Sequence, residues 1–285
     1  MSLGGRGRRT PRERGDEPYV PSAGRGRHRD GRWMSAEDDF FDPLAPPAEL
    51  SAELRLWDAA AGDWAAAVRV HADPARAVTE RAIAGLVRQV PPGPVLDAGC
   101  GEGWLSRELA AHRVNVTALD GAPGMVALAT EAHPAGDYRW VTFAGAADEP
   151  RRLGGAFGTI IFNYSLLDEK ITPILEAAGS VLFPYGRVLI QAAHPFGDGG
   201  IGGEYRDGWR TMEEAAPGVP LSRPVRWYFR TFTTWVLELR RAGLILVETY
   251  EPIDPATGRP ASLILHATIP ERRAPERPSP PRWGR

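Results

Sequence analysis

The sequence predicts an α/β fold built on a mostly parallel sheet, and three observations support that prediction. Short apolar runs alternate with amphipathic segments between about residues 94 and 193. A glycine-rich loop begins at Gly99, directly after the first apolar run, and an acidic residue, Asp120, ends the second run. Alternation of this kind places successive strands side by side, with the connecting helices on both faces of the sheet.

The individual elements follow from the positions of apolar, glycine and proline residues. Two Ala-rich amphipathic segments, about 48–70 and 74–90, predict an N-terminal cap of helices. Strands are then expected at 94–97, 114–120, 138–143, 159–163 and 187–193, with helices at 105–112, 123–132 and 171–182. Pro123 stands in the first turn of its helix, where its missing N–H removes no hydrogen bond.

The alternation stops after Pro195, in a stretch rich in Gly, Pro and Trp that we interpret as an insertion at about 195–230. A helix is expected at 233–242, because Gly243 stands in the usual position just beyond a helix C-terminus. Two more apolar runs, 244–249 and 262–268, predict a hairpin that closes the sheet.

Composition and charge divide the chain into three parts. The 285 residues carry 34 basic and 36 acidic side chains, and every basic one except Lys170 is Arg. Residues 1–32 hold nine Arg against four acidic residues, and residues 270–285 hold five against two. Neither segment has enough apolar residues to form a core, so we expect a disordered leader and tail around a domain at 33–269. The composition changes at Met34, where the Arg- and Gly-rich stretch ends, and one hypothesis is that translation starts at this methionine.

Bulk properties exclude several classes of protein. The body at 33–269 carries 20 basic and 30 acidic residues, which excludes a basic nucleic-acid-binding core. The single cysteine, Cys100, excludes an intrachain disulfide and a cysteine-built metal site. No apolar stretch reaches the roughly 18 residues that span a membrane. We therefore expect a cytoplasmic protein without a metal or membrane partner, and the sequence leaves its oligomeric state open.

The most informative segment is the loop Asp97–Trp104, with sequence DAGCGEGW. Glycines between a strand and a helix let the backbone approach a ligand, and the helix N-terminus offers free N–H groups. The dinucleotide fingerprint requires glycine where Trp104 stands, and no Gly-Lys-Ser/Thr sequence is present to hold a triphosphate. Asp120 ends the next strand, where a carboxylate binds ribose hydroxyls in sheets of this type. Taken alone, Asp120 is also a candidate helix N-cap.

From about Trp57 to Thr268, the chain resembles the class I S-adenosylmethionine-dependent methyltransferases of the bacterial small-molecule type. The resemblance rests on the glycine loop, on Asp120, and on the stretches FGTIIFN at 157–163 and VLFPYGRVLI at 181–190. It implies a Rossmann-like sheet of seven strands in the order 3-2-1-4-5-7-6, with the last strand antiparallel and the insertion as a lid. Gly158 and Tyr185 depart from the family pattern, which usually has Asp and Gly at these positions.

The resemblance also implies the cofactor S-adenosylmethionine, with S-adenosylhomocysteine as product. It places Asp97 near the amino acid end of the cofactor, Asp120 at the ribose, and Gly121 and Met125 beside the adenine. The complete set that it implies is Asp97, Gly99, Gly101, Gly103, Asp120, Gly121, Met125, Ala146, Ala147, Asp148 and Asn163. Ala146 stands where many relatives have the Asp that binds the adenine amine, so Asp148 or a backbone group takes that role.

Two candidate residues for catalysis follow the later strands. His194 comes directly after the strand at 187–193, at the edge where open α/β sheets bind ligands, and is the candidate base or substrate-orienting residue. The alternative is a structural histidine that fixes the turn at Pro195. Tyr164 follows the strand that ends at Asn163, and either forms a hydrogen bond with the substrate or lines its pocket.

Aromatic residues gather outside the nucleotide-binding half. Trp57 and Trp64 are seven positions apart, so they share one helix face, and Trp227 lies in the insertion. Singly, such residues are more often core than ligand contacts, but together they predict an apolar lid over the cleft. Arg230 either meets an acidic group of the substrate or pairs with Glu204 or Asp207. The acidic body and the aromatic lid indicate a neutral or cationic organic acceptor.

The sequence therefore predicts methyl transfer to a small metabolite, aromatic or heterocyclic, by in-line displacement in a closed pocket. Three alternatives stay open at this point. They are a quinone- or lipid-precursor methyltransferase, an RNA methyltransferase that uses the basic tails, and a non-catalytic protein that binds S-adenosylmethionine. The atom that receives the methyl group is not readable from the sequence.

Overall fold

The computed structural model describes residues 50–70, 74–89, 93–196 and 205–270, all of which belong to one compact unit. The predicted leader, the hypothetical start at Met34 and the predicted tail from residue 271 onward lie outside these described residues. The first elements are thus α1 (Ala52–Arg69) and α2 (Pro74–Arg88), close to the predicted helical cap.

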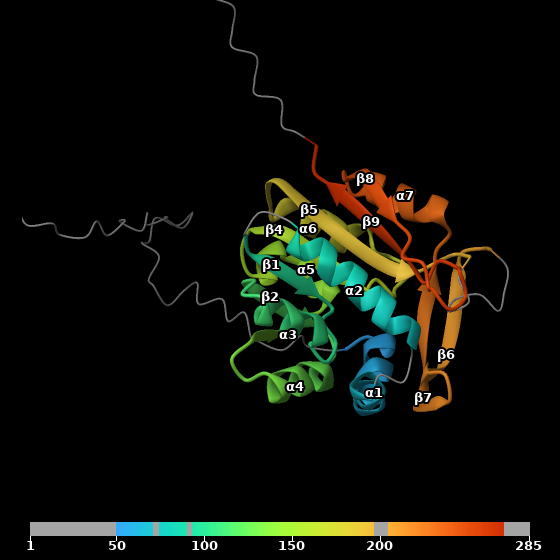
Figure 1. Cartoon of the computed structure of the whole chain (residues 1–285). Coiled ribbons are helices and arrows are strands. Elements are labelled where there is room, and N and C mark those ends of the chain that lie inside the picture. Colours follow the sequence, from blue (N-terminus) through green and yellow to red (C-terminus); the bar gives the residue numbers. More distant parts are fainter. Residues whose placement is uncertain (1–49, 71–73, 90–92, 197–204, 271–285) are drawn as a thin grey trace, which may run out of the picture. The chain divides into compact units, whose positions relative to one another are not determined.

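A seven-stranded sheet forms the centre of this unit (Figure 1). Its strands are β1 (Val95–Ala98), β2 (Val116–Asp120), β3 (Asp137–Trp140), β4 (Phe157–Asn163), β5 (Leu182–Ala193), β8 (Ile245–Tyr250) and β9 (Ser262–Thr268). The spatial order is β3-β2-β1-β4-β5-β9-β8, and β9 runs antiparallel to both of its neighbours. Counted within the sheet alone, this is the order 3-2-1-4-5-7-6, so the predicted fold class is confirmed.

Helices cover both faces of the sheet and enclose two apolar cores. On one face, α2 and α3 (Trp104–Ala111) pack over the central strands. On the other face lie α5 (Phe143–Asp148), α6 (Thr172–Ser180) and α7 (Phe232–Arg241). Ile160 and Ile161 are consecutive on β4 and are both fully buried, one in each core. A strand buried on both faces in this way reads as a continuous apolar run, which is how β4 appears in the sequence.

Two predicted boundaries are wrong, each for a local reason. The strand expected at 138–143 ends at Trp140, because the Thr142 hydroxyl accepts a hydrogen bond from the Gly145 amide (3.1 Å) and begins the short helix α5. The strand expected at 187–193 starts earlier, at Leu182, which pairs with Phe157 before a register shift. The pattern of apolar residues predicts neither the helix cap at Thr142 nor the register shift between β4 and β5. A short 3-10 helix at Pro150–Leu153 was also not predicted.

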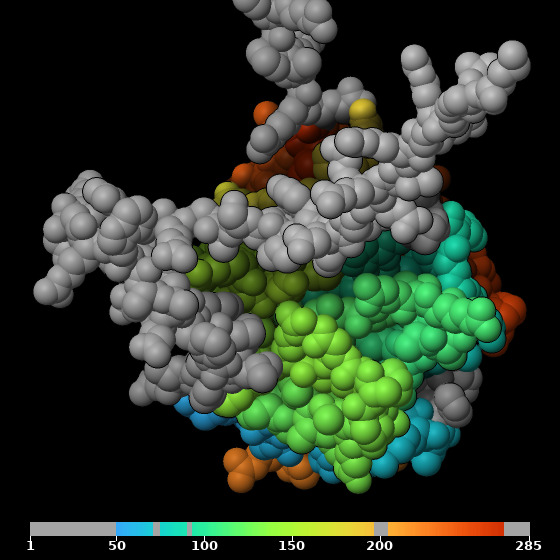
Figure 2. All heavy atoms as spheres, turned by 90° about the vertical axis from the view of Figure 1, so that its left-hand side faces the viewer, coloured from blue at the N-terminus to red at the C-terminus, as the bar shows by residue number. Residues whose placement is uncertain are grey.

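The described part of the insertion is a long hairpin outside the main sheet. β6 (Gly208–Ala216) and β7 (Val219–Phe229) form a separate two-stranded antiparallel sheet. Helix α1 packs against β7 on one side and against α4 (Pro123–Ala132) on the other. In Figure 2, α1 (blue) and the hairpin (orange) lie next to each other, below the green segments, which belong to the first half of the main sheet and its helices. The leading helix therefore joins that half to the insertion.

Candidate cofactor and acceptor site

The loop between β1 and α3 requires glycine at three positions. Gly99, Gly101 and Gly103 have φ of +76°, +56° and +81°, a region that favours residues without a Cβ. A Cβ on Gly99 would overlap the Cβ of Ser165, whose hydroxyl donates to the carbonyl of Ala98 (2.6 Å). The loop therefore lies directly against the segment that follows β4, and this contact shapes the floor of the site.

Asp120 holds the glycine loop from the neighbouring strand. Its Oδ2 accepts a hydrogen bond from the Gly101 amide (2.9 Å) and its Oδ1 accepts one from the Ala122 amide (2.8 Å). Burial raises the pKa of Asp120, although these amide bonds oppose the shift. A carboxylate has about four lone-pair sites, so two stay available for hydroxyl donors. The N-cap alternative is wrong, because the N-cap of α4 is Ala122.

Asp97 is the second buried carboxylate of the site and is only 1% exposed. Its Oδ2 accepts a hydrogen bond from the Ser106 hydroxyl (2.7 Å), but its Oδ1 is buried without a partner. Burial, and then the nearby charges of Asp120 and Glu102, raise its pKa to about 7. An unpartnered buried acceptor is costly, so this oxygen fits a ligand that brings a hydrogen-bond donor, such as an ammonium group.

A cavity of about 1350 Å³ opens above the carboxyl ends of the central strands. Most of the predicted site residues line it: Asp97, Gly99, Gly101, Asp120, Gly121, Met125, Ala147, Asp148, Asn163, Tyr164, His194, Trp57, Trp64, Trp227 and Arg230. Trp57 and Trp64 meet edge to face, with ring centroids 5.5 Å apart, as their spacing on one helix face predicts. The fold therefore brings the nucleotide loop, the later strand ends and the aromatic residues to a single cavity.

Two residues predicted to contact the cofactor do not line this cavity. Gly103 packs instead against α4 and β3, since a Cβ there would lie 2.9 Å from both Ala129 Cβ and Tyr138 Cε1. Ala146 is fully buried in the core beneath α5. These two positions face the protein interior instead.

His194 lines the cavity, but both of its ring nitrogens have partners in the protein. Nδ1 accepts a hydrogen bond from the Phe196 amide (3.1 Å), so the proton lies on Nε2, which is 2.9 Å from Oε1 of Glu251. This is the geometry of the structural alternative, a histidine that fixes the turn at Pro195. A role as base would require a ligand to take the place of one of these two partners.

Arg230 lines the cavity wall but is only 2% exposed. Its guanidinium donates to the backbone carbonyls of Leu166 (3.0 Å) and Asp168, and it lies over the rings of Tyr228 and Trp235. Burial lowers its pKa to about 10. The expected pair with Asp207 is wrong, because that carboxylate accepts from Thr231 and Thr234, and Glu204 lies outside the described residues. Arg230 holds the loop after β4.

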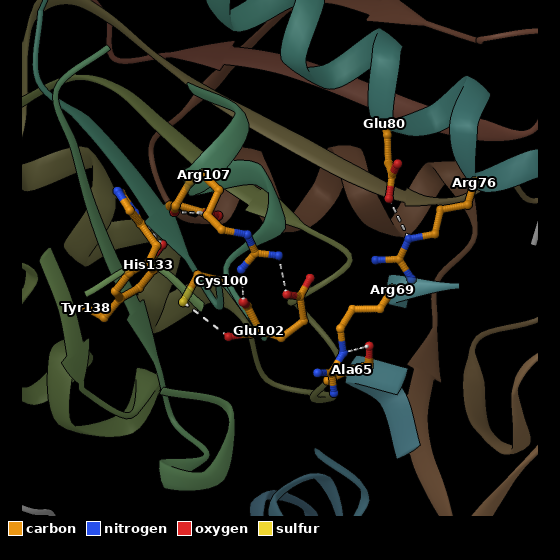
Figure 3. Close-up of polar contacts among 12 residues, drawn as sticks. Ala65, Arg69, Arg76, Glu80, Cys100, Glu102, Arg107, His133 and Tyr138 are labelled. Carbon is orange, nitrogen blue, oxygen red and sulfur yellow. Dashed lines mark hydrogen bonds and ion pairs between the residues drawn. The ribbon is translucent and has the colours of Figure 1, made fainter. Parts of the chain in front are cut away.

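Several residues at the site had no signal in the sequence. The Glu102–Arg107 pair (2.5 Å) joins the glycine loop to α3, and the Arg76–Glu80 pair (2.7 Å) lies on the cavity side of α2; Figure 3 shows both. Asp58 of α1 accepts a hydrogen bond from the Gly124 amide (2.6 Å) at the start of α4. The i, i+4 spacing of Arg76 and Glu80 was readable, but not that it faces a cavity.

Within the described residues, no helix is long and apolar enough to cross a membrane, and no group of three or more His, Cys, Asp or Glu side chains is placed to hold a metal.

Comparison with known proteins finds similarity to methyltransferases. Residues 95–186 match the family model of a methyltransferase domain. The bifunctional biotin biosynthesis protein BioHC of Cellvibrio japonicus is 26% identical over 168 residues, which are 57% of this chain, and the chain spans only 31% of that protein. A structure from Listeria monocytogenes, provisionally assigned as an S-adenosylmethionine-dependent methyltransferase, is 23% identical and superposes with a TM-score of 0.52. The match covers 68% of this chain and 100% of that protein. The glycopeptide N-methyltransferase MtfA with bound S-adenosylmethionine shares 18% identity over 70% of this chain and 88% of its own, also with a TM-score of 0.52.

The fold and the glycine loop define a Rossmann-like protein with a cavity at the carboxyl ends of its strands, where proteins of this fold bind their ligands. Within that class, residues 95–186 match the model of a methyltransferase domain, and solved structures with a similar fold include S-adenosylmethionine-dependent methyltransferases.

The raised pKa of Asp97 has a measurable effect on stability. Between the ordinary value of 3.8 and about 7, the folded protein holds a proton that the unfolded chain has released. The free energy of unfolding therefore falls as pH rises through this window and levels off above it. We expect Asp97→Asn to raise the free energy of unfolding of the cofactor-free protein at pH 8, by on the order of 3 kcal/mol, and to have little effect at pH 4.

Urea denaturation at both pH values measures this difference. Asp148→Asn is the control, since the Asp148 side chain is exposed and its replacement should leave the pH dependence unchanged. The same pH dependence in the wild type and in Asp97→Asn would contradict the prediction.

Proposed function

We propose that the protein transfers the methyl group of S-adenosylmethionine to a small organic acceptor. One observation carries this proposal: the glycine loop, Asp97 and Asp120 line the same cavity as the aromatic residues Trp57 and Trp227. The cavity thus has a nucleotide-binding wall and an apolar wall that face a common space. Its volume of about 1350 Å³ exceeds the usual range of roughly 300–1,000 Å³ for one small ligand, which suits a cofactor and an acceptor together.

The residues present fit this cofactor. We assign the ribose hydroxyls to the free lone pairs of Asp120 and the ammonium group to the unpartnered Oδ1 of Asp97. Gly121 and Met125 line the wall beside Asp120, where the adenine belongs, and Asp148 is the candidate for its amine. When bound, the cofactor supplies an activated methyl group. The chain's own contribution is to bind, orient and exclude water, since displacement at a sulfonium needs little acid–base chemistry.

The acceptor belongs to the aromatic wall. Trp57, Trp64, Trp227 and Tyr228 favour a flat, aromatic or heterocyclic metabolite. We also propose that the methyltransferase unit extends over 33–269, with the helices of about 48–90 and the insertion of about 195–230 as cap and lid. Tyr164, with φ of +53°, lines the cavity after β4, and we assign it to the acceptor side.

Replacement of Asp120 tests the cofactor assignment. We expect Asp120→Ala to weaken S-adenosylmethionine binding by at least about tenfold, because a lost hydrogen bond to a charged group is worth roughly 1.5–3 kcal/mol. Isothermal titration calorimetry gives the affinity directly. Asp63→Ala is the control, since Asp63 binds the Ser222 amide (2.7 Å) and does not line the cavity. An unchanged affinity in Asp120→Ala would refute the ribose assignment.

The function itself is tested by incubating the protein with methyl-labelled S-adenosylmethionine and a cell extract of its host that contains both small metabolites and RNA. We expect label in a small organic compound and release of S-adenosylhomocysteine. Label in RNA instead would favour the alternative substrate class. Cofactor binding without any labelled product would favour a non-catalytic binding protein.

A further inference from the structure

A pair of side-chain amides lies at the carboxyl ends of the two central strands β4 and β5. Asn163 of β4 and Gln191 of β5 are register partners, so their side chains leave the same face of the sheet. Both residues line the cavity. Neither amide oxygen, Asn163 Oδ1 nor Gln191 Oε1, has a hydrogen-bond partner, and both atoms are buried.

The orientation of the Gln191 amide is determined by its surroundings. Its Nε2 donates to the carbonyl of Thr79 in α2 (3.2 Å) and to the hydroxyl of Ser262 in β9 (2.8 Å). A carbonyl only accepts hydrogen bonds, so the nitrogen must face Thr79 and the oxygen must face away from it. The side chain is 1% exposed, and an unpartnered oxygen in such a position costs stability until a donor reaches it.

Two acceptor oxygens on register-paired side chains discriminate among ligand groups by the number of hydrogens that each group donates. A hydroxyl donates one hydrogen and satisfies one oxygen, and a carboxylate or carbonyl donates none. An amino group, neutral or protonated, donates at least two. We propose that Asn163 and Gln191 anchor an amino group of the methyl acceptor, so that the acceptor is a primary amine.

This inference rests on the proposed function, and it moves Asn163 from the cofactor to the acceptor. The cofactor's ammonium group already has a buried acceptor in Asp97, on β1. Gln191 lies two strands away, beyond β4, where the same cavity continues toward α2. The anchor therefore belongs to the second ligand.

Charged side chains of both signs also line the cavity. Glu53 of α1 and Asp168 both line it, and neither carboxylate makes a hydrogen bond or ion pair within the described part of the chain. Burial and the charge of Glu53 raise the pKa of Asp168, and the charge of Arg230 opposes this shift. The cation Arg76 is paired with Glu80 and Arg230 is bound to backbone carbonyls, whereas Lys170 adds a positive charge to the same wall. The preference for an amine therefore depends on the two amide oxygens and not on the charge of the wall.

Binding of three matched probes to the full chain loaded with S-adenosylhomocysteine tests the proposal. The probes are 2-phenylethylamine, 2-phenylethanol and 3-phenylpropionate, which share an aromatic ring for the apolar wall. We expect the amine to bind at least about tenfold more tightly than the alcohol, since it makes one more hydrogen bond to a buried acceptor, and the carboxylate to bind most weakly. Equal affinity for the amine and the alcohol, or tighter binding of the carboxylate, would overturn the proposal.

Variants separate the anchor from a structural role. Gln191→Met has a similar volume without the acceptor, and we expect it to lose the preference for the amine while its affinity for the alcohol is unchanged. Ser262→Ala is the matched control: it removes a partner of Gln191 Nε2 but leaves both oxygens, and Ser262 does not line the cavity. If Ser262→Ala abolishes the preference equally, the role of Gln191 is structural and the proposal is wrong.

Two further measurements keep the outcomes distinct. If Gln191→Met does not fold, Asn163→Ala removes the acceptor oxygen on β4 and should reduce the amine preference in the same direction. Calorimetry with S-adenosylmethionine separates this inference from the proposed function. A wild-type protein that binds no cofactor contradicts the proposed function, whereas cofactor binding without an amine preference contradicts only the anchor.

Discussion

Gly99→Ala should be the most damaging single-methyl substitution in the glycine loop, lowering the free energy of unfolding by roughly 3 kcal/mol. Two costs add. The residue has φ of +76°, which costs an L side chain about 1–2 kcal/mol, and its new Cβ would overlap the Cβ of Ser165, an overpacking that costs about 1–3 kcal/mol. Ser165 cannot move away without weakening its 2.6 Å hydrogen bond to Ala98.

Gly101→Ala is the matched control for this prediction. Its φ of +56° is also left-handed, but no heavy atom lies within 4 Å of the position of a Cβ. We expect it to show only the conformational cost, about 1 kcal/mol. Urea denaturation of the cofactor-free variants gives both values. Equal losses for the two variants would show that the contact with Ser165 relaxes freely, and the prediction would fail.

Arg230→Met should lower the free energy of unfolding by about 3 kcal/mol. Methionine keeps much of the volume but leaves the carbonyls of Leu166 and Asp168 without their donor, and each buried unsatisfied group costs about 1–3 kcal/mol. Relief of the buried charge offsets part of this loss. Because these carbonyls belong to the loop after β4, we also expect a raised KM for the acceptor once it is identified.

Arg226→Met is the control, on β7 four residues before Arg230. Arg226 is exposed and lies over the ring of Trp209 (4.6 Å to the centroid), a contact worth about 0.5–1 kcal/mol. Thermal and urea denaturation of both variants measure the difference. A loss for Arg230→Met no larger than that for Arg226→Met would mean that the guanidinium does not hold the loop.

The order of the elements was predictable because helices and strands leave periodic patterns in the sequence. The alternation between 94 and 193 predicted the parallel strands, and the apolar runs at 244–249 and 262–268 predicted the closing hairpin, which β8 and β9 confirm. The hairpin β6–β7 was not predicted, since its strands mix Pro, Arg and Glu with Trp and carry no clean period-two pattern.

The candidate site was only partly predictable, and the missing part consists of contacts between distant segments. A family pattern marks the positions where a loop approaches a ligand. It predicted Gly99 and Gly101, which both line the cavity. The same pattern does not distinguish Gly103, whose neighbours Ala129 and Tyr138 come from other elements. Gln191 carried no signal, because an amide at a strand end becomes informative only when its partners are known.

The sequence by itself determined the α/β class, the nucleotide loop with Asp120, and the gathering of Trp residues outside that half. Those features depend on local periodicity, backbone conformation and residue type, all of which neighbouring residues specify. Only the tertiary structure decided which groups His194 and Arg230 contact. Their partners, Glu251 and Leu166, lie 57 and 64 positions away along the chain, and packing alone brings such groups together. The same holds for the two unpartnered oxygens on β4 and β5, whose pairing depends on the register of the sheet.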